Sequence, residues 1–153
     1  MNIELNALPT TEEYTKFIGK NYHIFIPKFE QFSITPMSFH ASWNWPAFFF
    51  APWWFLYRKM YLWALLSFIS LCIPYLNFAA WIAWAVAAND LYYKYIQKKI
   101  AELKSFQGQN YVQYLVPIGG VHGWVPLVAI IVTLIPVVLA GACVGMLASA
   151  ISA

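Results

Sequence analysis

The feature that most constrains this chain is an uncharged run of 30 residues, 60–89, which directly follows the cations Arg58 and Lys59. A single straight helix of that length would rise ~45 Å and place these two cations on the opposite side of a membrane from the lysines that follow the run. The positive-inside rule disfavours such an arrangement. Because Pro74 and Asn77 interrupt the run, the sequence predicts a helical hairpin that turns there, with two spans of about 18 residues each.

The composition predicts the class of the protein. Of its 153 residues, 61% are hydrophobic and 10% are charged, whereas soluble domains are roughly one-half apolar and one-quarter charged. We therefore expect an all-α integral membrane protein. The net charge of +3 is spread in small groups beside apolar segments. No basic face is expected, which argues against nucleic acid as a partner.

An aromatic segment precedes the hairpin, from Trp43 to Tyr61. The 13 uncharged residues 45–57 would rise only ~20 Å as a helix, too little to cross ~30 Å of hydrocarbon. Pro46 and Pro52 also weaken a regular helix. We predict an element that is re-entrant or lies flat at the membrane interface. Its interfacial aromatic side chains would be Trp43, Trp45, Trp53, Trp54, Tyr57 and Tyr61.

The region 1–42 is expected to form amphipathic helices. Thr10 and Glu13 have the spacing of a capping box, which predicts a helix start at that point. Aromatic residues at helical spacing follow, accompanied by several lysines. Two interpretations remain open: the helices lie on an anionic membrane face, or they pack on the protein's own core.

The region 43–104 then contains the aromatic segment, the hairpin and a basic helix, and the region 105–153 contains a loop and a last helix. Trp124 to Ile151 is an uncharged stretch of 28 residues, which predicts a C-terminal transmembrane helix. Small residues recur every fourth position along it and predict a packing stripe for the protein's own hairpin or for another chain. The stripe consists of Gly141, Gly145, Ser149 and Ala153.

The positions of the cations predict a topology. If the basic helix ends are cytoplasmic, the hairpin leaves and returns, and the last helix crosses once more. The N-terminus would then be cytoplasmic and the C-terminus outside. The topology-setting cations are Arg58, Lys59, Lys94, Lys98 and Lys99.

Residues suited to catalysis are sparse. His23, His40 and His122 are far apart in the sequence and match no metal-binding spacing, so we expect no catalytic residue, metal or cofactor. An acid at the end of an apolar helix is costly unless it is paired. A turn at the predicted position would bring Asp90 within one helical turn of Arg58, and we predict a structural ion pair between them.

Three motifs resemble a known family: F-I-G-K-N from Phe17, N-W-P-A-F-F-F-A-P-W-W-F-L-Y-R-K-M-Y from Asn44, and N-D-L-Y-Y-K from Asn89. Together they resemble the bacterial domain-of-unknown-function family numbered twenty-six twenty-eight, which consists of small inner-membrane proteins. The chain departs from the family pattern at Pro46 and Ala51. The resemblance implies a bacterial inner membrane and supplies no catalytic residues.

The function expected from these features is that of a non-enzymatic interaction protein, multi-pass in the inner membrane, which acts as an accessory subunit or scaffold of a larger complex. The alternative is a small transport or lipid-handling component. Expected partners are membrane lipid and other membrane protein subunits or further copies of the chain, without nucleic acid.

Overall fold

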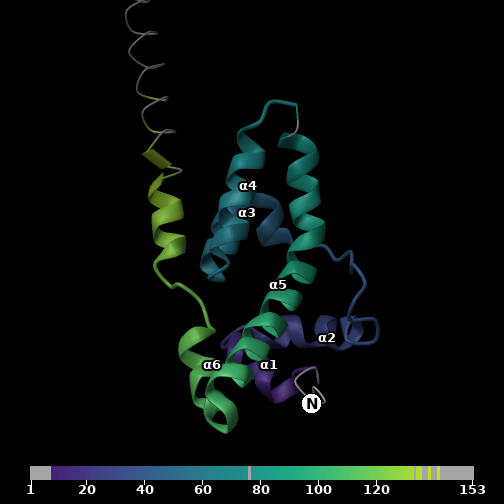
Figure 1. Ribbon diagram of the computed structural model, residues 1–153. Coiled ribbons are helices and arrows are strands. Elements are labelled where there is room, and N and C mark those ends of the chain that lie inside the picture. The colour runs from purple at the N-terminus through teal and green to yellow at the C-terminus, as the bar shows by residue number, and fades with distance from the viewer. Residues whose placement is uncertain (1–7, 76, 133, 136–137, 139–140, 142–153) are drawn as a thin grey trace, which may run out of the picture. The chain divides into compact units, whose positions relative to one another are not determined.

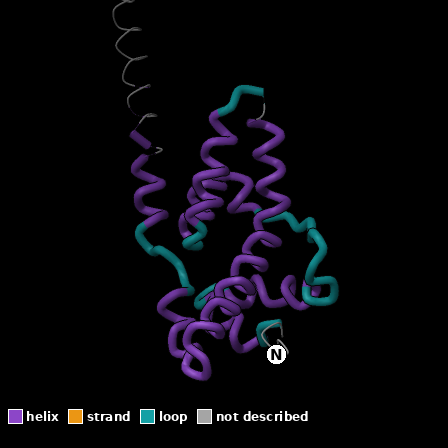
Figure 2. The backbone as a smooth tube through the Cα atoms, in the orientation of Figure 1, coloured by secondary structure: helices purple, strands orange, loops and turns teal. Residues whose placement is uncertain are grey.

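A computed structural model describes residues 8–75, 77–132, 134–135, 138 and 141. The chain divides into two compact units, Met1–His122 and Gly123–Ala153. All regular structure in the described residues is helical, which confirms the predicted all-α class (Figures 1 and 2). In the second unit, residues 125–132 are helical. The elements of the first unit are α1 (Thr11–Ile18), α2 (Tyr22–Phe32), α3 (Trp45–Tyr57), α4 (Tyr61–Cys72), α5 (Asn77–Gln107), the 3-10 helix η2 (Gly108–Tyr111) and α6 (Val112–Ile118).

Helix α1 begins at the predicted capping box. The Thr10 hydroxyl accepts a hydrogen bond from the Glu13 amide at 3.3 Å, and the Glu13 carboxylate accepts one from the Thr10 amide at 2.6 Å. These bonds satisfy two N–H groups that would otherwise lack a partner at the helix start. Gly19 ends the helix with φ +75°, a conformation that side chains disfavour.

Helix α5 organises the first unit, because α1, α2, α3, α4 and η2 all contact it. Figure 1 shows α3 and α4 beside its first half and α1 and α2 beside its second half. Its middle residues Tyr92, Tyr93, Ile96 and Ile100 are fully buried. The main core therefore surrounds the second half of α5.

Helix α2 fills this core with aromatic rings. Phe25 lies 5.1 Å from Tyr92 between ring centroids, and Phe29 lies 5.2 Å from Tyr93. Phe32, one turn further along, is also buried. The aromatic stripe of the N-terminal region thus packs on the protein's own core, which is one of the two arrangements expected.

Helix α3 is kinked where its prolines predict. Asn44 caps its start, since its side chain accepts the Ala47 amide at 3.0 Å. Phe50 leaves helical geometry at φ −139°, and Pro52 cannot donate to the carbonyl of Phe48 four residues earlier. The Trp81 indole N–H of α5 donates to that carbonyl instead. The kink thereby ties α3 to α5.

The predicted hairpin turn is confirmed, since α4 ends at Cys72 and α5 starts at Asn77. Tyr75 occupies the turn with φ +69°. The Asn77 amide donates to the Ile73 carbonyl at 3.1 Å, and the Asn77 side chain accepts the Phe78 amide at 2.8 Å. The turn therefore satisfies some of its own backbone groups.

The predicted multi-pass inner-membrane localisation is wrong. Among the described residues, no helix combines the length and the apolar character needed to cross a membrane. Helix α4 has 12 residues and rises only ~18 Å, while the 31-residue α5 carries several charges in its second half. The two predicted hairpin spans of about 18 residues are therefore corrected. Most of the third predicted span, 124–151, lies outside the described residues.

Candidate functional site

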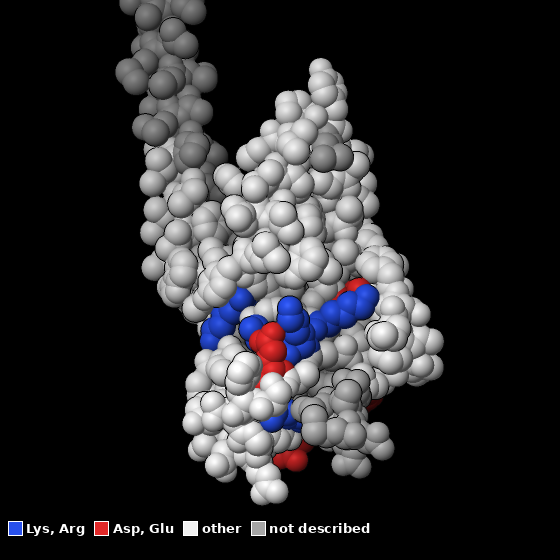
Figure 3. All heavy atoms as spheres, in the orientation of Figure 1, with Lys and Arg blue, Asp and Glu red and all other residues white. Residues whose placement is uncertain are grey.

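Helices α3 and α4, the turn after α4 and the first half of α5 form an uncharged region, which we call the apex (residues 45–57, 61–75 and 77–89). No Asp, Glu, Lys or Arg occurs in these ranges. Figure 3 shows the charged side chains as a band beneath this uncoloured region. The large exposed apolar side chains of the apex include Leu62, Leu65, Phe68, Ile69, Tyr75 and Phe78.

Inside the hairpin, small side chains occupy the buried positions. Ala64 and Ser67 are the buried residues of α4, and Ala80, Ala85 and Ala88 are buried in the first half of α5. Large apolar residues are the ones that proteins usually bury, yet many of those on these helices, such as Leu65 and Phe68, are exposed. Small residues at helix contacts and large apolar residues outside are the distribution found for helices packed in lipid.

Polar side chains of the apex bond within it. The Trp84 indole N–H donates to the Ser70 hydroxyl at 2.8 Å, and that hydroxyl donates to the Ser67 carbonyl at 2.9 Å. Ser67 itself donates to the Ala64 carbonyl at 2.9 Å. An apolar environment penalises polar groups that lack such partners. These internal bonds lower the cost of placing the apex against apolar material.

The predicted interfacial aromatic residues differ in how far they are exposed. Trp43, Trp45 and Tyr61 are exposed, and the first two meet edge to face with centroids 5.4 Å apart. Trp53 and Tyr57 are half-buried. Trp54 belongs to the core instead, where it is 7% exposed and lies 5.9 Å from the Tyr92 ring. Because α3 packs against both α4 and α5, one of its faces turns inward.

Arg58 is buried in a ring of aromatic side chains. Its guanidinium carbon lies 4.5, 5.0 and 5.6 Å from the ring centroids of Phe25, Tyr92 and Tyr57. Its Nη1 donates to the Tyr92 hydroxyl at 3.3 Å, and its Nε is buried without a hydrogen-bond partner among the described residues. Cation–π attraction favours this position. The predicted ion pair with Asp90 is not formed.

Asp90 binds His40 and Lys94 instead. Its Oδ1 accepts the His40 amide at 3.2 Å and the His40 Nδ1 at 2.8 Å, and its Oδ2 lies 2.8 Å from the Lys94 ammonium. The carboxylate is 1% exposed. On the other side of the imidazole, His40 Nε2 lies 3.1 Å from the Thr35 hydroxyl. The sequence did not predict His40 as the partner of Asp90, since the two residues are 50 positions apart and form no local pattern.

A second set of polar contacts holds the connector before α3 to α5. Asn44 Nδ2 donates to the side-chain oxygen Oδ1 of Asn89 at 2.9 Å, and Asn89 Nδ2 donates to the Ser42 hydroxyl at 3.1 Å. The Trp43 carbonyl accepts Asn89 Nδ2 and the Lys28 ammonium, both at 3.3 Å. Burial lowers the pKa of Lys28. These contacts lie where the uncharged half of α5 ends.

Lys59 connects the end of α3 to the end of α6. Its ammonium donates to the carbonyls of Pro117 at 3.2 Å and Ile118 at 3.4 Å, and also to that of Gly119. The carbonyls at a helix C-terminus carry partial negative charge and lack intrahelical donors. Lys59 adopts φ +62° in this position. It therefore acts as a side-chain cap for α6.

The remaining topology-setting cations lie along the second half of α5. Lys99 pairs with Glu102 at 2.8 Å, and Lys98 is exposed. The predicted C-terminal packing stripe lies outside the described residues except for Gly141, which is helical and exposed. Its packing partner stays a prediction.

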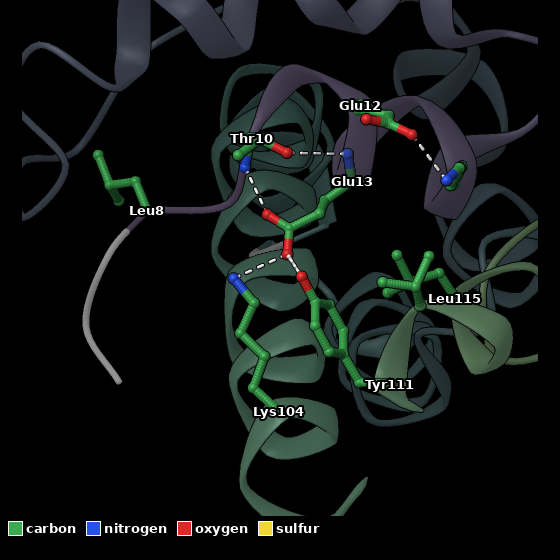
Figure 4. Close-up of a pocket in the computed structure, with 9 residues that line it drawn as sticks. Leu8, Thr10, Glu12, Glu13, Lys104, Tyr111 and Leu115 are labelled. Carbon is green, nitrogen blue, oxygen red and sulfur yellow. Dashed lines mark hydrogen bonds and ion pairs between the residues drawn. The ribbon is translucent and has the colours of Figure 1, made fainter. Parts of the chain in front are cut away.

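A small cavity of about 210 Å³ lies between the start of α1 and the end of α5 (Figure 4). Glu13 lines it and accepts Lys104 Nζ at 2.7 Å and the Tyr111 hydroxyl at 2.5 Å. Burial raises the pKa of Glu13, but hydrogen bonds from Lys104, Tyr111 and the Thr10 amide outweigh burial and hold it below its usual value. These bonds occupy both carboxylate oxygens, so Glu13 serves as a latch between α1, α5 and η2.

No protein-family model, curated protein or solved structure matches this chain. The resemblance to the family numbered twenty-six twenty-eight therefore stays a prediction.

Proposed function

We propose that this protein is a non-enzymatic interaction protein that attaches to a lipid bilayer by inserting its apex into one leaflet without crossing it. The observation that carries this proposal is the distribution of side chains in α4 and the first half of α5. Small residues are buried between the helices, and residues such as Phe68 and Phe78 are 59% and 67% exposed. Lipid solvates such a surface better than water does.

The dimensions of the apex suit one leaflet. Helix α4 has 12 residues and rises ~18 Å, while half of a ~30 Å hydrocarbon core is ~15 Å. Transfer of a fully exposed phenylalanine or leucine out of water contributes roughly 1.5–3 kcal/mol, and the partly exposed apex side chains contribute a share of that. Several such side chains together exceed the cost of desolvating a turn whose backbone is partly bonded internally.

A protein attached in this way would present α1, α2 and α6 away from the lipid. In that orientation it would act as an accessory subunit or scaffold at the bilayer surface. Its buried polar residues agree with this role, because they form contacts that join the helices of the protein to one another. Asp90, for example, joins the connector before α3 to α5. The partner in such a complex is a membrane protein or a second copy of the chain.

Flotation with phospholipid vesicles tests the attachment. We expect the full chain to float with vesicles, and Phe68→Glu in the apex to reduce the bound fraction several-fold, since a carboxylate at hydrocarbon depth is costly. Phe106→Glu is the matched control, because Phe106 is 84% exposed in the second half of α5. It should float like the wild type.

Equal flotation of both variants and the wild type would reject the apex as the attachment surface. If the wild type fails to float and elutes as a defined oligomer that Phe68→Glu dissociates, the apex is a protein interface and the lipid proposal is wrong.

A further inference from the structure

We propose that the cations at the base of the apex, Lys28, Arg58 and Lys59, form a binding site for the phosphate groups of anionic phospholipids. This inference rests on the proposed function, because it assigns these residues to headgroup depth when the apex is in the bilayer. Its basis is a comparison of which cations of the first unit pair with a carboxylate and which do not.

Away from the apex base, four of the six lysines have carboxylate partners, while Lys20 and Lys98 have none among the described residues. Four lysines form ion pairs, and each uses a different acid: Lys16 with Glu12, Lys94 with Asp90, Lys99 with Glu102, and Lys104 with Glu13. Among the described residues, the three cations at the apex base pair with no carboxylate. Their charge is therefore not cancelled within the first unit.

Each of the three is held at the apex by contacts that leave its charge intact. Lys28 reaches the carbonyl of Trp43, whose ring contacts Trp45 at the start of α3. Arg58 directly follows α3 and Lys59 precedes α4 by two residues. Lys28 thus lies beside the start of α3, and Arg58 and Lys59 lie at its end, so all three border the uncharged apex.

The surroundings of these groups strengthen their effect on an anion. Arg58 is 4% exposed among aromatic rings, and Lys28 is half-buried. Coulomb attraction grows as water is removed, so partly buried cations beside hydrocarbon attract an anion more strongly than surface lysines do. Burial lowers the pKa of Lys28 because it removes water from the charged ammonium. An adjacent anion would stabilise the charged form and so offset this loss of hydration. Arg58 is buried and therefore contributes a positive electrostatic potential to the site, while the half-buried Lys28 and Lys59 lie nearer the surface.

Anionic phospholipid matches this arrangement because it offers acyl chains and negative headgroups at adjacent depths. Juxtamembrane lysines contribute about 1 kcal/mol each through attraction to anionic lipid. A free anion in solution would gain nothing from the neighbouring apolar apex. The apex and the cations at its base together therefore favour lipid over a soluble anion.

Vesicle binding by the full chain tests this inference. Vesicles of phosphatidylcholine alone are compared with vesicles that contain about 30% phosphatidylglycerol, a content that gives a negative surface potential. We expect tighter binding to the anionic vesicles, with an apparent Kd that rises with salt. Lys28→Gln should weaken binding to the anionic vesicles about fivefold, which corresponds to ~1 kcal/mol.

Lys98→Gln is the matched control, since Lys98 is exposed on α5 and lies ~14 Å beyond Asn89 along the helix. It changes net charge equally and should leave the preference unchanged. Lys28→Arg, which keeps the charge, should bind like the wild type and controls for folding. Equal binding to both kinds of vesicle, or an equal loss in Lys28→Gln and Lys98→Gln, would overturn the inference. In either case binding to neutral vesicles would leave the proposed attachment itself intact.

Discussion

The carboxylate of Asp90 receives two hydrogen bonds from one residue, His40, whose amide and Nδ1 both donate to Oδ1 at 3.2 and 2.8 Å. The connector between α2 and α3 is thereby fixed to the middle of α5. Lys94 pairs with the other oxygen of the same buried carboxylate. Because a buried charge is costly unless it is paired, this contact should determine both the stability and the path of the connector.

Replacement of Asp90 tests this relationship. We expect Asp90→Ala to lower the free energy of unfolding by about 3 kcal/mol, since it removes the acceptor for His40 and Lys94. In a double-mutant cycle measured by urea unfolding, Asp90→Ala and His40→Ala should couple by at least ~1 kcal/mol. The same cycle with Arg58→Ala should be additive within ~0.5 kcal/mol. Strong coupling to Arg58 would contradict the observed pairing.

Local features of the fold could be predicted from the sequence. The capping box needs only Thr10 and Glu13 three residues apart, and the hairpin turn follows from a proline and an asparagine that interrupt an apolar run. Such features depend on neighbours in the chain, so a single sequence contains the necessary information.

The candidate site could be predicted only in part. Counting residues from the turn placed Arg58 near Asp90. That count could not predict that aromatic rings surround the guanidinium, or that the connector folds onto α5 and brings His40 to Asp90. Both contacts join residues far apart in the sequence. The predicted span of about 18 residues before the turn failed because it counted flanking residues that are not helical, so that α4 covers only Tyr61–Cys72.

The Glu13 latch predicts a specific pH dependence. The folded-state pKa of Glu13 lies below its usual value of 4.5, so its stabilising contribution is complete above that pH and is lost as the pH falls through the folded-state pKa. Its carboxylate raises the pKa of Tyr111 to about 12, so that contribution is complete below pH 10 and is lost as the pH rises through the raised value. The latch is therefore strongest between these limits.

Thermal unfolding at several pH values measures this effect. Wild type should exceed Glu13→Gln in Tm at neutral pH, and the difference should shrink as the pH falls below 4.5. Glu12→Gln is the control, because the neighbouring Glu12 side chain is 76% exposed and pairs with the surface residue Lys16. Its Tm should follow the wild type, and a pH-independent difference for Glu13→Gln would argue against the latch.

The kink in α3 predicts that two substitutions depend on each other. Trp81→Phe keeps a ring to stack on Phe48 but removes the indole donor to the Phe48 carbonyl, and should cost about 1 kcal/mol of unfolding free energy. Pro52→Ala supplies a backbone N–H that can bond to that carbonyl within the helix. The cost of Trp81→Phe should therefore fall in the Pro52→Ala background, as measured by urea unfolding. An unchanged cost would mean that the indole bond contributes nothing.

The contact of α6 with α1 should tolerate no side chain at Gly119. A Cβ atom built there would lie 2.2 Å from the Phe17 carbonyl oxygen and 2.7 Å from that of Leu115, and both are backbone atoms that cannot rotate away. Since the Gly120 amide also donates to the Phe17 carbonyl at 2.7 Å, relief of the clash would break that bond. Gly119→Ala should cost about 2–3 kcal/mol in urea unfolding. Gly123→Ala, whose Cβ would meet no atom within 4 Å, should change stability little, and equal effects of the two changes would show that this contact is not tightly packed.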